Sequence, residues 1–260
     1  MLIKKQYDQL PLYHFEHLSK QEDIKHYISS REGGNSEEHL SSLNIGLAVN
    51  DHPENPVNNR AKIATALGIS PSHLIFPSQT HSDHITVIED IDTPTLDTDA
   101  LITNKKGICI SVMTADCVPV LLYDPVAKAV AAIHAGWRGS VEDICGKTIQ
   151  LMKEKYNCQP QHILAGIGPS ICVKNYETGA EVIEAVQKLT GDAHPFIASP
   201  QANGKANLDL WTLNQYLLQK AGVLPENIEI ANICTFERND LFYSARRGKT
   251  GRFGSGILLQ

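Results

Sequence analysis

The sequence has no C-x-x-C pair, no long apolar run and no excess of positive charge. Without C-x-x-C, its 6 cysteines build neither a zinc ribbon nor a thioredoxin-like redox motif. The net charge of −6 gives no basic surface for nucleic acid or an anionic membrane. No apolar stretch is long enough to span a bilayer, and the first residues lack the apolar region of a secretory signal. We therefore expect a cytoplasmic protein that acts on small molecules.

Several short catalytic signatures are missing as well. The chain contains no G-x-S-x-G, H-E-x-x-H or G-x-G-x-x-G motif. Gly248-Lys249-Thr250 resembles the end of a P-loop, but Tyr243 stands where the first glycine of that motif is required. The sequence thus excludes the P-loop NTPases and favours none of the common hydrolase or dinucleotide-binding classes.

Apolar periodicity and turn residues indicate a mixture of strands and helices. We expect strands at 73–77, 84–89, 107–113, 117–123, 128–134, 163–167, 228–234 and 256–259, and helices at 59–67, 140–155, 180–189 and 210–220. These elements do not alternate strictly as βαβ units, which favours an α+β fold with mixed sheets. The strands between 107 and 134 are apolar on both faces, which is typical of a sheet that is covered on both sides. No boundary divides the chain, and we expect residues 1–260 to form a single domain.

The most informative segment is an expected hairpin at 117–134. Its turn begins at Asp124-Pro125, and a loop centred between Pro125 and Val126 would place Cys117 opposite His134. Opposed residues have Cβ atoms about 4.5–5.5 Å apart. That separation suits two ligands of one metal ion, at about 2.3 Å for sulfur and 2.0–2.1 Å for nitrogen. It would equally suit a cysteine–histidine catalytic dyad.

His81 lies in a polar loop between two expected strands. A loop histidine is more often simply solvated, so its position alone is weak support for a ligand. Together with Cys117 and His134 it would form a His₂Cys site with one open position, which is the arrangement of a catalytic zinc. A metal-free cysteine hydrolase that uses Cys117 and His134, and a structural zinc in a non-catalytic module, remain alternatives.

Two further segments could bind an anion. Residues 134–140 run from a strand end through a Gly-rich turn into an expected helix that starts near Ser140, and Arg138 adds guanidinium donors. Arg246 and Arg247 follow two aromatic residues and could also bind phosphate or cap the carboxyl end of a helix. The alternative for the first segment is an ordinary strand–helix turn in which Trp137 is buried and Arg138 is solvated.

Motifs spread in order over most of the chain resemble one family, variously named polyphenol oxidase, laccase-domain protein and purine nucleoside phosphorylase. They are Asn44-Ile45-Gly46, Gln79-Thr80-His81-Ser82, Asp99-Ala100-Leu101-Ile102-Thr103, Ala115-Asp116-Cys117-Val118-Pro119-Val120, His134-Ala135-Gly136-Trp137-Arg138-Gly139, Gly168-Pro169-Ser170-Ile171, Leu208-Asp209-Leu210, Cys234-Thr235 and Phe242-Tyr243-Ser244 with Arg246-Arg247. The resemblance implies one zinc ion on His81, Cys117 and His134. It also implies a layered α-β-β-α fold, similar to the catalytic domain of cytotoxic necrotizing factor.

The activity that the resemblance implies is phosphorolysis of adenosine, inosine, guanosine and methylthioadenosine, with deamination of adenosine. Its partners would be purine nucleosides and phosphate; an older assignment is a copper-dependent phenol oxidase. The candidate catalytic residues are Cys117, Asp116 and Tyr243, and the candidate substrate or phosphate ligands are Asn44, Gln79, Arg138, Arg246 and Arg247. The chain departs from the family pattern at Asn50, at Gly248 and in the stretched segment 172–179.

Overall fold

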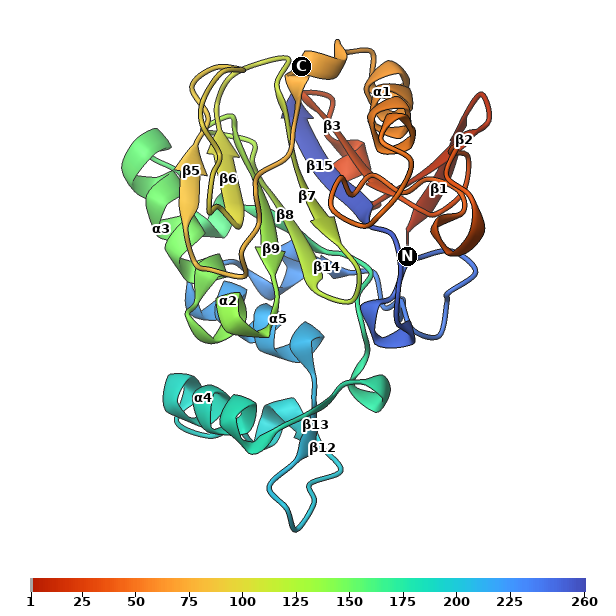
Figure 1. Cartoon of the computed structure of the whole chain (residues 1–260). Coiled ribbons are helices and arrows are strands. Elements are labelled where there is room, and N and C mark those ends of the chain that lie inside the picture. The colour runs from red at the N-terminus through yellow and green to blue at the C-terminus, as the bar shows by residue number, and fades with distance from the viewer. Residues whose placement is uncertain (1) are drawn as a thin grey trace.

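In a computed structural model, which describes residues 2–260, two six-stranded sheets lie face to face (Figure 1). The first sheet has the order β1 (Ile3–Tyr7), β2 (Leu10–His14), β3 (Ile24–Ser29), β15 (Phe253–Leu259), β7 (Cys109–Thr114), β4 (Leu74–Ile75). The second has the order β14 (Ile228–Ile230), β10 (Leu164–Ile167), β8 (Val118–Asp124), β9 (Ala129–Ala135), β6 (Ala100–Thr103), β5 (Ile85–Val87). Both sheets are mixed, because β4 and β7, β5 and β6, and β10 and β14 pair in parallel while their other neighbours are antiparallel.

The remaining elements are helices and a small third sheet. The helices are α1 (Glu54–Leu67), α2 (Trp137–Val141), α3 (Ile144–Tyr156), α4 (Ala180–Thr190) and α5 (Leu210–Lys220). The third sheet has the order β11 (Glu177–Thr178), β13 (Ala206–Leu208), β12 (Ile197–Ala198). In Figure 1, α4, β12 and β13 lie below the two large sheets.

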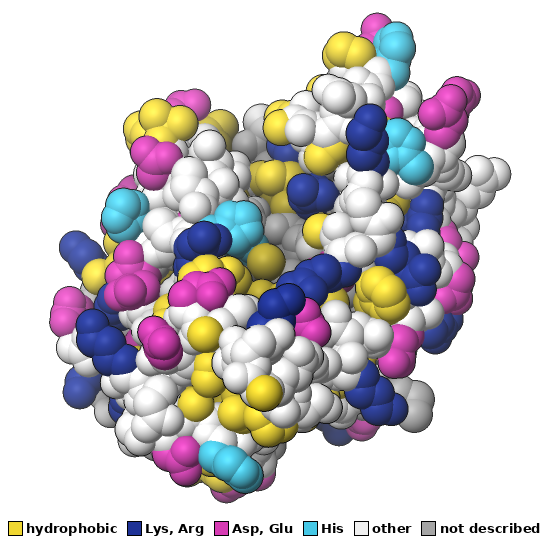
Figure 2. Space-filling model, turned by 60° about the horizontal axis from the view of Figure 1, so that its bottom comes forward, with side chains coloured by type: hydrophobic (Ala, Val, Ile, Leu, Met, Phe, Trp, Pro, Cys, Tyr) yellow, Lys and Arg dark blue, Asp and Glu magenta, His cyan; other side chains and the backbone are white. Residues whose placement is uncertain are grey.

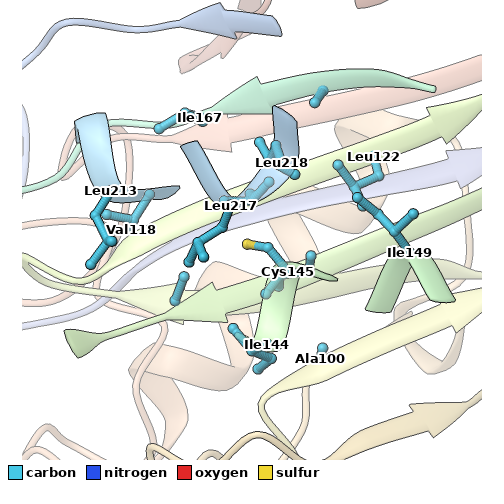
Figure 3. Close-up of a cluster of buried hydrophobic side chains, with 14 of the residues drawn as sticks. Ala100, Val118, Leu122, Ile144, Cys145, Ile149, Ile167, Leu213, Leu217 and Leu218 are labelled. Atoms are coloured by element: carbon cyan, nitrogen blue, oxygen red, sulfur yellow. The ribbon is translucent and has the colours of Figure 1, made fainter. Parts of the chain in front are cut away.

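Side chains along β8 alternate between its two faces, and this alternation explains why the second sheet packs against helices on one side and against the first sheet on the other. Val118 and Leu122 point to the cluster that contains α3 and α5, as Figure 3 shows, whereas Leu121 and Tyr123 point to the cluster shared with the first sheet. A third cluster packs α1 against the outer face of the first sheet, with Ile63 on the helix side. The sequence-based expectation of an α+β fold with α-β-β-α layers is therefore confirmed.

The register of the hairpin corrects one prediction. Asp124 is opposite Ala129, and His134 is opposite Pro119 rather than Cys117, so the predicted pairing is wrong by two residues. The reason is a longer turn, in which the Asp124 carboxylate accepts hydrogen bonds from the next backbone amides. Because side chains alternate along a strand, a shift of two residues leaves the face unchanged.

The structure also differs from the prediction of one helix over residues 140–155. It is split into α2 and α3, and Asp143, with a φ of 58°, caps α3 by accepting from the Gly146 amide. Ser140 lies inside α2, and its hydroxyl contacts Asn214 instead. The end of α1 at Gly68, with a left-handed φ of 74°, follows the prediction. Within residues 2–260, no helix is long and apolar enough to cross a membrane.

Candidate metal centre

His81, Cys117 and His134 form a candidate metal-binding group. Their ligand atoms all lie within 4.8 Å of one another, and Cys117 Sγ is 3.9 Å from His81 Nε2. In a tetrahedral zinc site the sulfur and nitrogen ligands are about 3.5 Å apart. A movement of a few tenths of an ångström would therefore bring this pair to metal-binding distance, and the donor set fits zinc. His134 belongs to β9, whereas His81 and Cys117 lie on loops.

Asp99 holds two of these ligands in place. Its buried carboxylate lies 2.7 Å from His134 Nδ1, and it accepts hydrogen bonds from the backbone amides of His81 and Ser82 and from the Ser82 hydroxyl. Burial raises the pKa of Asp99, but the hydrogen bonds from His134 and Ser82 outweigh burial and hold it well below its usual range. A charged Asp99 leaves His134 Nε2 free to bind a metal ion, which is the usual support for a histidine ligand.

Cys117 and His134 shift each other's pKa. Burial raises the pKa of the Cys117 thiol, but His134 and His81 outweigh burial and lower it to about 6. Burial lowers the pKa of His134, whereas the Cys117 thiolate and Asp99 raise it to about 9. These opposite shifts favour a negatively charged Cys117 beside a positively charged His134, and a metal cation can replace the proton on that imidazole.

Gly136 is closely surrounded beside the candidate metal centre. A Cβ atom there would lie 3.1 Å from Cys117 Sγ and 3.2 Å from His81 Cδ2. Its φ of −70° is open to any residue, so a substitution here is limited by these two contacts and not by the backbone conformation. The glycine after β9 thus lets the His81 loop approach the hairpin.

The candidate metal centre lies in a cavity of about 700 Å³, within the size range of small-molecule sites. On the face shown in Figure 2 the surface is hollowed, and Lys, Arg and His side chains gather around the hollow. The cations that line the cavity are Arg60, Arg138, Arg246 and Arg252, and its larger apolar side chains are Phe76, Met113, Trp137 and Tyr176. The cavity therefore combines a metal-type group, positive charge and aromatic surface.

The arginines of the cavity stack on its aromatic walls. The guanidinium of Arg246 lies 4.8 Å from the centre of the Tyr176 ring, and that of Arg138 lies 4.4 Å from the Trp137 ring. Arg60 lies 4.5 Å from the Phe76 ring; burial lowers its pKa to about 10, so it stays charged at neutral pH. Stacking restrains these planar cations. Some of their donors are already used within the protein, because Arg60 Nε donates to the Ile45 carbonyl and Arg246 donates to the Glu177 carbonyl.

Arg247 and Tyr243 are not brought to the cavity lining. Arg247 stacks 4.2 Å from the Phe236 ring and donates to the Phe236 carbonyl. Tyr243 is buried, and its hydroxyl donates to the Leu40 carbonyl at 2.5 Å. The sequence predicted that both residues lie at the substrate site together with Arg246, because the three are close in the chain. In the structure their side chains point in different directions, and only Arg246 lines the cavity. Neither residue is retained as a substrate ligand or proton donor.

Asp116 lies beside Cys117 with a positive φ of 87°. Its carboxylate accepts hydrogen bonds from the Thr235 hydroxyl at 2.6 Å, the Ser244 hydroxyl at 3.0 Å and the Arg246 amide at 2.8 Å. With three donors bound to it, this carboxylate ties the Arg246 segment and Thr235 to the residue next to Cys117.

Asn44 and Gln79 have similar structural contacts. The Asn44 side chain is fully buried and accepts from the amides of Gly46 and Arg252, so it orders the cavity wall without lining it. Gln79 lines the cavity, but its amide pairs with the backbone of Met113 in both directions at 2.8 Å. That pairing anchors the loop that carries His81.

Sequence reasoning named no role for Asp99, Arg60 or Tyr176. The available signal for Asp99 was a carboxylate directly before an apolar strand, where a buried charge requires a specific partner. Arg60 and Tyr176 had no local signal, because they reach the cavity from α1 and from the segment before β11.

Residues 25–260 match the family described as multi-copper polyphenol oxidoreductase laccase, and the chain belongs to that family. It is 37% identical to a purine nucleoside phosphorylase of Bacteroides thetaiotaomicron, over 94% of this chain and 95% of the relative. It is 35% identical to the adenosine deaminase RL5 of an unknown prokaryotic organism, over 91% and 94% of the two chains. The crystal structure of the hypothetical protein YfiH of Bacillus licheniformis is 31% identical, with a TM-score of 0.91 and 99% of each chain covered.

Proposed function

We propose that this chain is a zinc-dependent enzyme of purine nucleosides, which cleaves them with phosphate and also deaminates adenosine. Its nucleoside substrates would be adenosine, inosine, guanosine and methylthioadenosine. The observation that carries the proposal is the His₂Cys group inside a cavity lined by four arginines. The names of two relatives, a purine nucleoside phosphorylase and an adenosine deaminase, support both reactions.

The proposed zinc ligands are His81, Cys117 and His134. When bound, zinc would supply a Lewis acid that lowers the pKa of a water ligand toward about 7. Asp99 keeps the His134 ring oriented and fixes the His81 backbone through the hydrogen bonds described above. Three protein ligands leave one position of a tetrahedral site for water or substrate.

Phosphorolysis requires a second, anionic substrate, and the arginines supply the charge for it. Arg138 and Arg246 are exposed cations that line the same cavity as the metal group, and Arg252 is a third, half-buried cation. Guanidinium groups bind phosphate through paired hydrogen bonds. The aromatic wall at Tyr176 provides a flat apolar surface for a purine base. We assign Asp116 to the positioning of Arg246 and not to protonation of the leaving base.

Copper-dependent phenol oxidation is the second candidate, because the family description names copper. Cysteine and histidine ligands can bind copper as well as zinc. Reduction of dioxygen by several electrons needs further copper sites, which are typically rich in histidine. Among residues 2–260, the other metal-type group is Cys172, Cys234 and Glu237, which contains no histidine. The lack of histidine in this second group favours the nucleoside activity over copper-dependent oxidation.

The experiment is product analysis by chromatography with zinc-loaded protein, with and without phosphate. Inosine should yield hypoxanthine and ribose 1-phosphate only when phosphate is present. Adenosine should yield some inosine without phosphate, because attack by water at C6 needs no anion. Cys117→Ala should abolish both reactions and remove one metal ion per chain.

Each outcome is informative. Release of base from inosine at equal rates with and without phosphate would exclude phosphorolysis and indicate a hydrolase. Oxidation of a phenol by copper-loaded protein, with no nucleoside turnover, would establish the copper alternative. Nucleoside cleavage by metal-free protein that persists after chelation would instead favour the cysteine–histidine dyad.

A further inference from the structure

A second group of metal-type side chains lies outside the cavity lining. The ligand atoms of Cys172, Cys234 and Glu237 all lie within 4.8 Å of one another. Cys172 Sγ is 3.9 Å from Glu237 Oε1, and the Cys172 amide is 3.3 Å from Cys234 Sγ. Two thiols and a carboxylate in contact form a donor set that the nucleoside reaction does not use.

Parallel pairing of two distant segments brings these residues together. Ser170 forms a β-bridge with Cys234, in which the Ser170 amide donates to Ile233 and the Thr235 amide donates to Ser170. Both thiols are buried in a small apolar cluster with Ile171, whereas Glu237 is exposed. The group is therefore anchored by backbone pairing and is open to solvent at its carboxylate.

Asn175 marks the point on which the three side chains converge. Its Nδ2 atom lies 3.3 Å from Cys172 Sγ, 3.6 Å from Cys234 Sγ and 3.1 Å from Glu237 Oε1. Because one amide nitrogen lies within 3.6 Å of all three atoms, these atoms surround a common position. A cation at that position would interact with the same three atoms.

We propose that Cys172, Cys234 and Glu237 form a second metal site, which binds a thiophilic divalent cation of the zinc class. Both thiols release their protons to solvent on binding, and the Asn175 amide moves aside from the metal position. The Asn175 carbonyl oxygen or a water molecule would complete a tetrahedral site. Thiolate sulfur selects zinc or cadmium over magnesium and calcium, which prefer oxygen ligands.

Occupancy of this second site would stabilise one wall of the cavity. Tyr176 follows Asn175 directly and lines the cavity, and Thr235 follows Cys234 and donates to Asp116. A metal ion would thus cross-link two segments that hold residues beside Cys117.

The test is a cadmium titration of the full chain after removal of metal with a chelator. Sulfur-to-cadmium charge-transfer absorbance reports thiolate binding, and equilibrium dialysis gives the stoichiometry. The parent protein should bind two cadmium ions per chain, Cys117→Ala one and Cys172→Ala one, and the double variant none. Cys158→Ala, which removes another buried thiol, is the matched control and should still bind two.

If Cys172→Ala does not fold, Glu237→Gln tests the second site instead. This exposed substitution should weaken the second site about tenfold or more while the first site is unchanged. Binding of only one cadmium ion by the parent, lost in Cys117→Ala, would overturn the proposal. Unchanged stoichiometry in Cys172→Ala would also overturn it. A reduced thiol count with a mass lower by two hydrogens would indicate a Cys172–Cys234 disulfide in place of a metal site.

Discussion

His134 Nδ1 lies 2.7 Å from Asp99 Oδ1, and both side chains are almost fully buried. Since Asp99 also accepts from the amides of His81 and Ser82, one carboxylate supports two of the three candidate metal ligands. The geometry is that of a carboxylate–histidine pair behind a metal ion.

Asp99→Asn should therefore weaken zinc binding about 10- to 100-fold, because a neutral amide supports the His134 ring less well. Competition with a fluorescent chelator measures the affinity. Asp92→Asn, at an exposed carboxylate in a nearby loop, is the control and should bind zinc as the parent does. Equal zinc affinity in Asp99→Asn and the parent would contradict a supporting role for Asp99.

Arg138→Ala should raise the KM for phosphate about 10- to 140-fold, because it removes one charge-assisted contact of about 1.5–3 kcal/mol. The KM for the nucleoside and the zinc content should change little. Arg238→Ala is the control, since Arg238 pairs on the surface with Asp240 at 2.7 Å. If phosphate saturates Arg138→Ala and the parent equally, the anion site does not include Arg138.

Gly136→Ala should reduce zinc affinity and activity, because its Cβ would press on Cys117 and His81. Gly107→Ala provides the contrast: nothing lies within 4 Å of a Cβ there, but the φ is +76°. That variant should lose about 1 kcal/mol of stability through backbone strain and keep its zinc. Metal analysis and urea unfolding of both variants separate crowding of the site from loss of stability. Full zinc affinity in Gly136→Ala would show that the loops yield to the methyl group.

The protein should lose stability in mild acid through buried histidines. Burial is the main cause that lowers the pKa of His14 to about 4, from 6.5. His26 Nε2 accepts from the Phe15 amide, and burial lowers its pKa as well. Below pH 6.5 the unfolded chain takes up protons that the folded chain does not, so unfolding becomes easier as the pH falls toward 4. His14 alone should cost roughly 2 kcal/mol at about pH 4.5.

Urea unfolding at about pH 7.5 and about pH 4.5 measures this loss. His14→Phe keeps an aromatic ring beside Tyr7 and His26 but removes the titrating group, so its stability should fall less in acid. The exposed His39→Gln should retain the acid sensitivity of the parent. An equal loss in His14→Phe and the parent would exclude His14 as a source of that sensitivity.

Local sequence was sufficient for several parts of the fold. Gly68 ends α1, the bounds of α5 follow from its apolar spacing, and the hairpin was expected within a few residues of β8 and β9. It was also sufficient to place Cys117 near His134, despite an error of two residues in the register. Side-chain direction repeats every two residues in a strand, so that error did not change the face.

Only the tertiary structure decided which other residues surround that pair. It brought Asp99, Arg60 and Tyr176 to the site and directed Arg247 and Tyr243 away from it. It also brought the Cys172 amide within hydrogen-bonding distance of Cys234 Sγ, although the two residues are 62 positions apart in the sequence. Periodicity reports how a residue sits on its own strand or helix. Which loops meet across two sheets depends on long-range packing and on backbone conformations such as the positive φ of His81.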